Sequence, residues 1–312
     1  MADTGLIQEI KKKIFESGAS ACGCARAEKL QREYDFLVQW IKSGKYAGKE
    51  YFERTLALRA DPEKIVHNAK TVIAVLYNYY SKESLHEKQF YRISKYAYGK
   101  DYHWVIQDKL DAVACFIKQI TGSLNTQAFV DTSPIFEKAW AQRAGLGWIG
   151  KNTLLVNEKT GTFHFIGLIV TDIEMQYDTP VDEKCGNCEL CINACPTGAL
   201  TGPHELDARK CISNLTLDKN IVLPAELKDK FNNYIYGCDI CQDACPWNKT
   251  LVPATEPHFQ INEKLKGLSR EDLENLNEDN FFKITEKSAI RRLGFSAFMR
   301  NIGFVKNSKE NL

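Results

Sequence analysis

The sequence lacks an excess of charge of either sign, and it lacks long apolar runs. Its 312 residues include 41 Lys or Arg and 40 Asp or Glu, so the formal net charge at pH 7 is +1. No overall charge draws the protein to nucleic acid or to a membrane, and any such surface must be a local patch. No apolar run approaches the roughly 20 residues that cross a bilayer, and residues 1–13 lack the apolar core of a signal peptide. We expect a cytoplasmic protein that does not contact a membrane.

Cysteine, in contrast, is abundant and unevenly placed. Of the 11 cysteines, eight lie between Cys185 and Cys245. The cytosol keeps thiols reduced, so disulfides are not expected, and clustered thiols in such a chain more often hold metal. The other three, Cys22, Cys24 and Cys115, fall in apolar or helical stretches and need no metal. The remaining composition, 44% hydrophobic and 26% charged, is that of an ordinary globular protein.

Apolar periodicity predicts a mixed fold, of the α+β or α/β class, over residues 1–175. The expected elements are a helix and a strand in 1–30, mainly helices over 31–69, a buried strand over 71–80, a helix over 101–121, a strand over 126–132, a helix over 133–145 with Ser133 as its N-cap, and a hairpin of 152–157 with 162–173. Residues 176–255 form short segments that should depend on metal to fold. Residues 256–312 predict a short helical C-terminal segment.

The clustered cysteines follow the spacing of bacterial ferredoxins. The first run is Cys-x2-Cys-x2-Cys-x3-Cys-Pro, from Cys185 to Pro196, and the second run, which ends at Pro246, repeats its last three cysteines. In two-cluster ferredoxins the first three thiolates of a run hold one [4Fe–4S] cluster and the fourth holds the other. The second run has Ile235 in place of a leading cysteine, and Cys211 is the unassigned cysteine nearby.

This pattern predicts two [4Fe–4S] clusters that exchange ligands between the runs. Cluster 1 would take Cys185, Cys188, Cys191 and Cys245, and cluster 2 would take Cys195, Cys211, Cys238 and Cys241. The alternative is structural zinc at two four-thiolate sites, but zinc sites favour two separated Cys-x2-Cys pairs. Two neighbouring clusters would form a path for electrons.

Four stretches of the sequence together resemble one enzyme family. They are CGNCELCINACPTGAL (185–200), YGCDICQDACPWN (236–248), FVDTSPIFEKAWAQRAGLGWIGKNTLLV (129–156) and YAYGKDYH (96–103). In this combination they resemble the epoxyqueuosine reductases, and the similarity runs in consistent order from residue 5 to residue 250. The ferredoxin spacing alone does not distinguish this family, whereas the VDTSP and GWIGKN motifs do.

The resemblance implies cobalamin and two [4Fe–4S] clusters as cofactors. It implies reduction of epoxyqueuosine to queuosine at the wobble position of tRNA as the reaction. Residues 1–175 would form a cobalamin-binding catalytic domain distantly similar to reductive dehalogenases, and residues 176–255 a ferredoxin-like domain. Many members continue into HEAT-like helical repeats. Here residues 288–304 resemble the first helix of that region, so the tRNA contacts of the repeats would be absent or replaced.

Two other interpretations of the sequence stay open. One is a ferredoxin-type electron carrier that docks to a partner enzyme. The other is a cobalamin-dependent reductase of a small halogenated or epoxide substrate. The large N-terminal part argues against the carrier, and the VDTSP and GWIGKN motifs argue against the small-substrate enzyme.

Asp131 is the candidate catalytic acid. It follows an apolar strand and precedes a helix, and ligands bind at the carboxyl ends of strands in α/β sheets. The general acid proposed for the resembled family lies in the same VDTSP motif. The structural alternative is a carboxylate that caps helix 133–145. The helix dipole would lower its pKa, so proton donation requires burial beside the cofactor. Glu137, one turn further, is the alternative acid.

The candidate cobalamin contacts lie in several motifs. YAYGKDYH contributes Tyr98, GWIGKN contributes Lys151, and the stretch around the cluster ligands contributes Ser213. The full set is Arg54, Tyr98, Asp131, Lys151, Asn152, Thr153, Leu155, Ser213 and Gln242. The alternatives are a solvated loop, with Asp101 as a helix N-cap, a plain turn at GWIGKN and a solvated helix charge at Arg54. His164 is expected to be packed rather than to bind cobalt.

The candidate tRNA contacts are basic side chains. From Phe281 to Leu312 the sequence has seven Lys or Arg against two acidic residues, and attraction to phosphate would weaken with salt. The expected contacts are Lys100, Lys219, Arg291, Arg292 and Arg300, with support from Lys306 and the lysines between Lys82 and Lys100. The alternative is an ordinary solvated helix face. We further expect a monomer that receives electrons from an unidentified low-potential donor.

Overall fold

The computed structural model describes residues 4–85 and 90–306. At its centre is a four-stranded sheet in the order β1-β2-β7-β4, formed by β1 (Ala21–Arg26), β2 (Thr71–Asn78), β4 (Gln127–Val130) and β7 (His164–Thr171). Every neighbouring pair is antiparallel. The mixed fold predicted from the sequence is confirmed, and the antiparallel sheet selects α+β over α/β.

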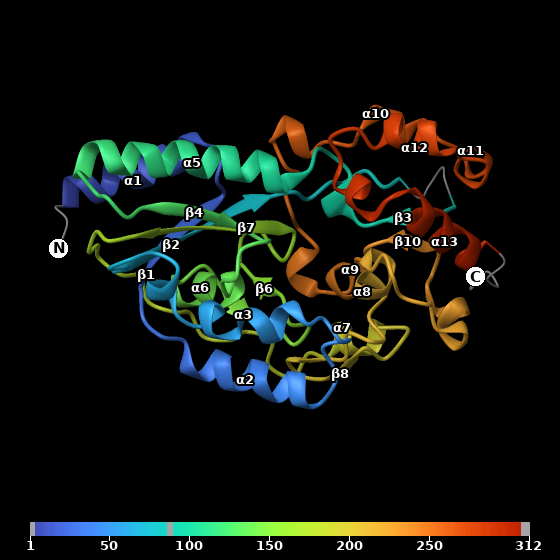
Figure 1. Cartoon of the computed structure of the whole chain (residues 1–312), viewed down its shortest axis with the longest axis horizontal. Helices are drawn as coiled ribbons and strands as arrows, with labels where there is room; N and C mark the ends of the chain where they lie inside the picture. Colours follow the sequence, from blue (N-terminus) through green and yellow to red (C-terminus); the bar gives the residue numbers. More distant parts are fainter. Residues whose placement is uncertain (1–3, 86–89, 307–312) are drawn as a thin grey trace.

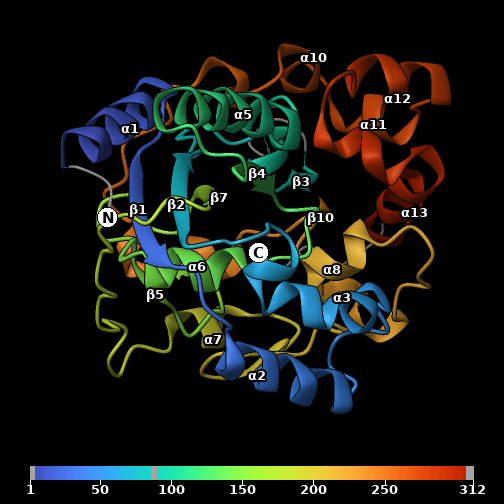
Figure 2. The same cartoon turned by 60° about the vertical axis from the view of Figure 1, so that its left-hand side comes forward.

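Helices cover both faces of this sheet. Helices α1 (Thr4–Glu16) and α5 (Tyr102–Thr121) lie over one face, and α6 (Glu137–Arg143) lies over the other (Figures 1 and 2). Strand β2 reads as a continuous apolar run because both of its faces are covered, so all of its residues except Asn78 are buried. Side chains alternate between the two faces, so Ile73 packs with α5 while Val72 packs with Trp140 of α6.

The remaining elements are short. In the N-terminal half they are α2 (Gln31–Lys42), α3 (Tyr51–Arg59), η1 (Pro62–Lys64), β3 (Arg92–Ile93), η2 (Lys95–Ala97), β5 (Trp148–Ile149) and β6 (Leu155–Val156). In the C-terminal half they are α7 (Leu190–Ala194), β8 (Leu200–Gly202), β9 (Glu205–Leu206), α8 (Ile212–Leu217), η3 (Ala225–Lys230), β10 (Tyr234–Tyr236), α9 (Ile240–Asp243), η4 (Pro246–Asn248), η5 (Pro257–Phe259), α10 (Glu263–Lys266), α11 (Arg270–Glu274), α12 (Glu278–Ile284), η6 (Ala289–Leu293) and α13 (Phe295–Val305).

The C-terminal helices share a core with segments that lie far away in the sequence. Phe281 and Phe298 pack in one apolar cluster with Leu215 and with Tyr91, which precedes β3. Helix α13 is also fixed by Asn301, whose buried side-chain amide donates to backbone carbonyls at 2.8 and 2.9 Å. The domain boundaries predicted at residues 175 and 255 therefore do not separate the apolar cores. Residues 307–312 of the predicted C-terminal segment lie outside the described residues.

The helix predicted over residues 133–145 starts later than expected. It begins at Glu137, with Phe136 rather than Ser133 at the N-cap position. Neither Ser133 nor Asp131 caps it, and residues 131–136 form an irregular loop. Ser133 and Pro134 lie within this loop, where the Ile135 N–H donates back to the Ser133 carbonyl at 2.8 Å instead of starting a helical turn. The capping alternative for Asp131 is therefore wrong.

The predicted hairpin of residues 152–157 with 162–173 is also wrong. Strand β6 pairs with β5, and β7 pairs with β2 and β4. The bridge between Asn157 and Gly161 closes only the turn that connects the two predicted strands. Strand β7 is almost wholly apolar, so it is stable only between two other strands in the centre of the sheet. Within residues 4–85 and 90–306, no helix is long and apolar enough to cross a membrane.

Candidate active site and cysteine clusters

Asp131 begins the loop that joins β4 to α6. Its φ of +48° lies in the left-handed region, which residues other than glycine seldom adopt. Its carboxylate accepts hydrogen bonds from the Tyr102 hydroxyl and, at 2.8 Å, from His103 Nε2. Its backbone N–H donates to the carboxyl of Glu137. Side chains from α5 and α6 thus hold Asp131 in a strained conformation, and such strain is common at functional sites.

His103 lies between two carboxylates. Its Nδ1 is 2.6 Å from Asp101 Oδ1, its Nε2 is 2.8 Å from Asp131 Oδ2, and Arg292 Nε donates to the other Asp101 oxygen at 2.6 Å. Because both ring nitrogens face carboxylates, the imidazolium form can donate to both. Burial lowers the pKa of His103, but the two carboxylates outweigh burial and leave this pKa above its ordinary value. A chain of charged groups therefore links the C-terminal segment to Asp131.

Asp131 and Glu137 have pKa values shifted in opposite directions. Displacement of water by the surrounding protein raises the pKa of Asp131, but hydrogen bonds from His103 and Tyr102 leave it below its ordinary value. Desolvation, followed by the negative charge of Asp131, raises the pKa of Glu137 to about 8. At neutral pH Asp131 is ionised and Glu137 is protonated. Pairs of carboxyl groups whose pKa values are pushed apart are typical of acid–base sites.

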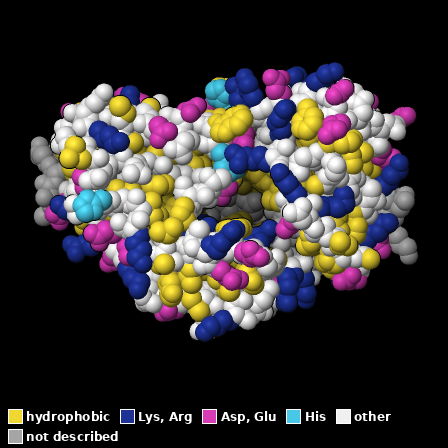
Figure 3. All heavy atoms as spheres, in the orientation of Figure 1, with side chains coloured by type: hydrophobic (Ala, Val, Ile, Leu, Met, Phe, Trp, Pro, Cys, Tyr) yellow, Lys and Arg dark blue, Asp and Glu magenta, His cyan; other side chains and the backbone are white. Residues whose placement is uncertain are grey.

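A cavity of about 330 Å³ opens next to Tyr96 and Lys138, and among the described residues neither Asp131 nor Glu137 lines it. Tyr96 lines it and contacts the Tyr102 ring edge-on, with the ring centroids 6.1 Å apart, and Lys138 of α6 lines it next to Glu137. The cavity lies between the α6–β6 region and helices α8 and α9, where Figure 3 shows the surface hollowed with Lys and Arg side chains beside the hollow.

Four cysteines line the opposite side of this cavity. They are Cys195, Cys211, Cys238 and Cys241, the four that the sequence assigns to cluster 2. Cys241 lies close enough to Cys195 and Cys211 for their charges to interact. This cysteine group therefore borders the same cavity as Tyr96 and Lys138, which connect it to the carboxyl pair through Tyr102 and Glu137.

The other four cysteines line a smaller cavity of about 60 Å³. They are Cys185, Cys188, Cys191 and Cys245, the four that the sequence assigns to cluster 1. In the described part of the chain, no three His, Cys, Asp or Glu side chains come close enough to hold one metal ion. Four thiolates on a single zinc ion lie about 3.8 Å apart, whereas each thiolate of a cubane binds a different iron. The two sets of four thiols match the ligand number of two cubanes.

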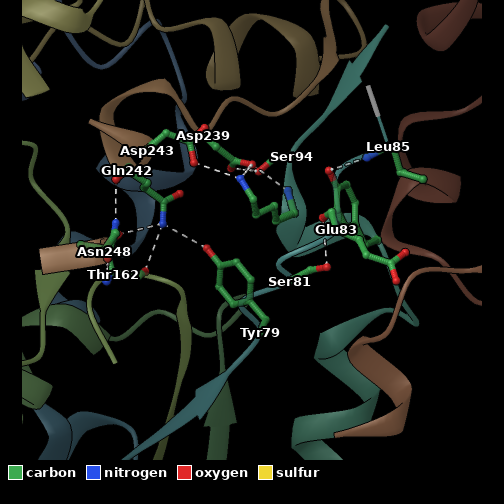
Figure 4. A network of polar contacts seen from close by, with 12 residues as sticks. Tyr79, Ser81, Glu83, Leu85, Ser94, Thr162, Asp239, Gln242, Asp243 and Asn248 are labelled. Atoms are coloured by element: carbon green, nitrogen blue, oxygen red, sulfur yellow. Dashed lines mark hydrogen bonds and ion pairs between the residues drawn. The ribbon is translucent and has the colours of Figure 1, made fainter. Parts of the chain in front are cut away.

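A buried polar network fastens the second cysteine run to the sheet (Figure 4). The side-chain amide of Gln242 donates to the Tyr79 hydroxyl at 3.2 Å and to the Thr162 carbonyl at 3.1 Å. Asn248 donates to the Gln242 carbonyl at 2.7 Å, and its own oxygen accepts from the Thr162 N–H. Gly161 has a φ of +59°, and a Cβ there would lie 1.9 Å from the Asn248 oxygen. The loop that bears Cys241 and Cys245 is thus rigidly placed.

The structure brings four of the predicted cobalamin contacts to the large cavity. They are Asn152, Thr153, Ser213 and Gln242. Lys151 lines the smaller cavity instead. His164 is packed, as expected, and burial lowers its pKa to about 4.

Three other predicted contacts lie elsewhere. Tyr98 is 2% exposed in the C-terminal core, where its hydroxyl accepts from the Leu85 N–H, so it is a packing residue. Leu155 is buried in the core under α6, and its neighbour Leu154 lines the cavity. Arg54 is exposed on α3. Among the described residues none of these three lines the large cavity, because a motif identifies a stretch of chain but does not show which way each side chain points.

Two of the predicted tRNA contacts have roles within the fold. Arg300 donates to the backbone carbonyls of Asp218, Lys219 and Ile221 at 2.8 to 3.2 Å, so it fastens a loop to α13. Arg292 binds Asp101, as described above. The other three are Arg291, whose guanidinium lies over the Phe282 ring, and the exposed Lys100 and Lys219.

Sequence reasoning missed four residues of the site. Tyr96 and Tyr102 belong to YAYGKDYH, and Lys138 follows Glu137, so the motifs contained a signal for these three. Lys138 Nζ donates to the Thr153 carbonyl at 2.7 Å and so ties α6 to the GWIGKN loop. Arg59 ends α3, and its charge interacts with those of Glu137 and Asp131, a proximity that no local pattern indicates.

Comparisons with known proteins agree with this geometry. Residues 59–132 match the family described as epoxyqueuosine reductase QueG, DUF1730, and residues 184–248 match the 4Fe-4S double cluster binding domain. The chain is 41% identical to an epoxyqueuosine reductase of Cellulophaga algicola, covering 95% of this chain and 97% of that protein. It is 37% identical to an epoxyqueuosine reductase of Escherichia coli, covering 95% of this chain and 79% of that protein.

Solved structures of epoxyqueuosine reductases have the same fold. One, with a tRNA-Tyr epoxyqueuosine-modified stem loop, matches with a TM-score of 0.86 and 28% identity, over 96% of this chain and 80% of that chain. Another, from Bacillus subtilis, has its catalytic aspartate loop swung out of the active site. It matches with a TM-score of 0.85 and 26% identity, over 96% of this chain and 81% of that chain.

The grouping of the cysteines yields a prediction about iron content. Replacing Cys211 with Ala should remove one ligand of cluster 2 and leave cluster 1 intact, so that about four of eight iron atoms remain after reconstitution. Iron and sulfide analysis measures this loss. Cys115→Ala is the matched control, because Cys115 is an exposed thiol of α5 and its loss should leave the iron content unchanged. Full iron content in the Cys211 variant would contradict the grouping.

Proposed function

Because the chain belongs to the epoxyqueuosine reductase family, we propose that this oxidoreductase reduces epoxyqueuosine to queuosine at the wobble position of tRNA. The observation that carries the proposal is a single cavity lined by four cysteines and by Tyr96 and Lys138, which connect it to the Asp131–Glu137 pair through the Tyr102 ring and along α6. Removing an epoxide oxygen as water requires two electrons and two protons. Such a cavity can receive electrons from one side and protons from the other.

The electrons would travel through the two cysteine groups. Cys195, Cys211, Cys238 and Cys241 would hold the cluster nearest the cavity, and Cys185, Cys188, Cys191 and Cys245 the more remote one. The 4Fe-4S double cluster match supports this assignment. Residues 182–189 beside the remote group are mostly exposed, which suits electron entry from a low-potential donor.

The cavity fits a macrocyclic cofactor with polar edges. Hydroxyl and amide groups of Thr153, Ser213, Asn152 and Gln242 line it and can bind the amide side chains of cobalamin, while Leu154 offers apolar contact. Bound cobalamin would supply a strongly reducing cobalt centre next to the clusters. The protein's own contribution is to place these groups, to exclude water and to hold a proton at the Asp131 carboxyl.

Asp131 would deliver the proton to the departing epoxide oxygen. Its side chain is 51% exposed, so substrate can reach it. Substrate bound over it would displace water, which raises a carboxyl pKa and favours the protonated form. His103 lies at hydrogen-bond distance and can pass a proton to it. The B. subtilis structure with a catalytic aspartate loop supports this role for the 131–136 loop.

The tRNA would bind across the mouth of the cavity. A relative binds an epoxyqueuosine-modified stem loop, and a base inside a loop must be turned outward to reach an enclosed site. Lys100, Lys219 and Arg291 have exposed charges for phosphate contacts. Arg292 and Arg300 would act mainly within the protein, through Asp101 and the 218–221 loop.

The proposed reaction can be tested directly. The chain is reconstituted anaerobically with iron, sulfide and cobalamin, then incubated with a strong reductant and tRNA that contains epoxyqueuosine. Nucleoside mass spectrometry should show conversion to queuosine that depends on cobalamin. Clusters without corrin absorption, together with unchanged tRNA, would identify an electron carrier instead. Reduction of a small epoxide without any action on tRNA would identify the small-substrate enzyme.

Replacing Asp131 with Asn should abolish turnover while leaving cofactor content intact. The amide keeps the size of the side chain but cannot donate an acidic proton, and loss of such a group typically costs roughly 10²–10⁴-fold in rate. Single-turnover assays with matched iron and cobalamin content measure the effect. Asp111→Asn, at an exposed site on α5, is the control. Near-normal turnover by the Asp131 variant would remove Asp131 from the mechanism.

Glu137 should determine the alkaline limit of activity. Its pKa of about 8 means that it is neutral below this pH and ionised above it. Ionisation would place a second negative charge beside Asp131 and disturb the loop, so turnover should fall as the pH rises through about 8. Glu137→Gln keeps a neutral acceptor for the Asp131 N–H, so it should remain active and lose this decline. A variant profile identical to that of the parent would contradict this role.

A further inference from the structure

A tryptophan from the GWIGKN motif lies against the remote cysteine group. The indole Nε1 of Trp148 is 3.4 Å from Cys185 Sγ, within hydrogen-bond distance of the sulfur. Trp148 is fully buried, and an indole N–H can only donate. Among the described residues, Cys185 is the one cysteine of this group whose sulfur accepts from a side chain, whereas Cys191 and Cys245 interact with the backbone N–H groups of Ile192 and Trp247.

The backbone around Trp148 packs tightly against β6. Trp148 begins β5, which pairs with β6 through the Trp148–Val156 register. Gly147 before it has a φ of +151°, and a Cβ there would lie 2.1 Å from the Val156 carbonyl oxygen. The strand pair can therefore approach this closely only with glycine at position 147. The indole is consequently presented to Cys185 by a rigid turn.

A second tryptophan packs against the first. Trp247 follows Cys245 and Pro246, lines the small cavity, and meets the Trp148 ring edge-on, with the centroids 4.9 Å apart and the rings inclined at 75°. The two indoles come from distant parts of the sequence: Trp148 lies in β5 and Trp247 in η4, directly after the second cysteine run. Trp247 supplies bulk and excludes water, and its backbone N–H interacts with Cys245; among the described residues only Trp148 donates to a sulfur of this group through its side chain.

We propose that the Trp148 indole N–H sets the reduction potential of the cluster held by Cys185, Cys188, Cys191 and Cys245. This inference rests on the proposed cluster ligation. Reduction adds one electron to the cluster and so increases the negative charge on its thiolates. A hydrogen bond to a sulfur stabilises the more negative state, and such bonds are among the factors that set cluster potentials. Trp148 therefore raises the potential of this cluster and favours its reduction by an external donor.

The cavity-side group has a different partner. The Thr197 hydroxyl lies 3.7 Å from Cys195 Sγ, and the indole bond is confined to the remote group among the described residues. The two clusters thus differ in the donors near their sulfur atoms although their cysteine motifs are nearly the same. Removal of the indole N–H should change one midpoint potential and leave the other unchanged.

The experiment compares Trp148→Phe with Trp247→Phe in the reconstituted full chain without cobalamin. Redox titration followed by electron paramagnetic resonance gives the two midpoint potentials. Trp148→Phe should shift one of them to a more negative value, at full iron content, and the other should stay in place. Trp247→Phe should shift the two midpoint potentials less than Trp148→Phe does, because it removes bulk but no side-chain hydrogen bond to sulfur.

A second substitution separates the hydrogen bond from packing. Benzothienylalanine at position 148 has the shape of tryptophan with sulfur in place of the N–H, and it should give the same negative shift even if the phenylalanine variant loses iron. Unchanged potentials in this protein at full iron content would overturn the proposal. A chain without cubane signals would overturn both the ligation and the tuning, whereas a shifted potential in a chain inactive on tRNA would overturn the proposed reaction alone.

Discussion

The arrangement of the molecule depends on one constraint: Cys245, from the second cysteine run, must lie beside the first three cysteines of the first run. Cys245 lies with Cys185, Cys188 and Cys191 around one cavity, while Cys195 leaves the first run to join the second. The chain between the runs must therefore fold back on itself. The buried network of Gln242, Thr162 and Asn248 fixes this reversal to the sheet. Because the second run is held there, one cysteine group faces the large cavity and the other faces the outside.

The carboxyl site depends on a different kind of placement. Asp131 leaves the edge strand of an antiparallel sheet, so the rule for parallel sheets that first suggested its role does not apply. Its position follows from the left-handed turn after β4 and from the contacts with Tyr102, His103 and Glu137. The same surroundings leave Asp131 ionised and Glu137 neutral at neutral pH. Side chains that hold this loop therefore determine both the position of the Asp131 carboxylate and the pKa values of the two carboxyl groups.

The sequence predicted the features that local patterns determine. The apolar runs located β2 and α5, and the cysteine spacing predicted the two groups that line separate cavities. The start of α6 and the partner of β7 were wrong, because both depend on contacts between distant segments. Side-chain direction was the other weak point: Tyr98 and Leu155 belong to site motifs but point into cores. Arg59 and Lys138 entered the site only through the packing of α3 and α6.

The bond between Arg292 and Asp101 joins residues 191 positions apart in sequence. It connects the C-terminal helices to the residues that contact Asp131, although these helices border neither cysteine cavity. Cutting the chain after residue 287 would leave every cysteine in the chain, yet it would remove the guanidinium that binds Asp101 behind His103 and the Asn301 amide that binds the Thr216 and Ile235 carbonyls. The C-terminal segment is thus joined through one ion pair to the hydrogen bonds that hold the Asp131 carboxylate.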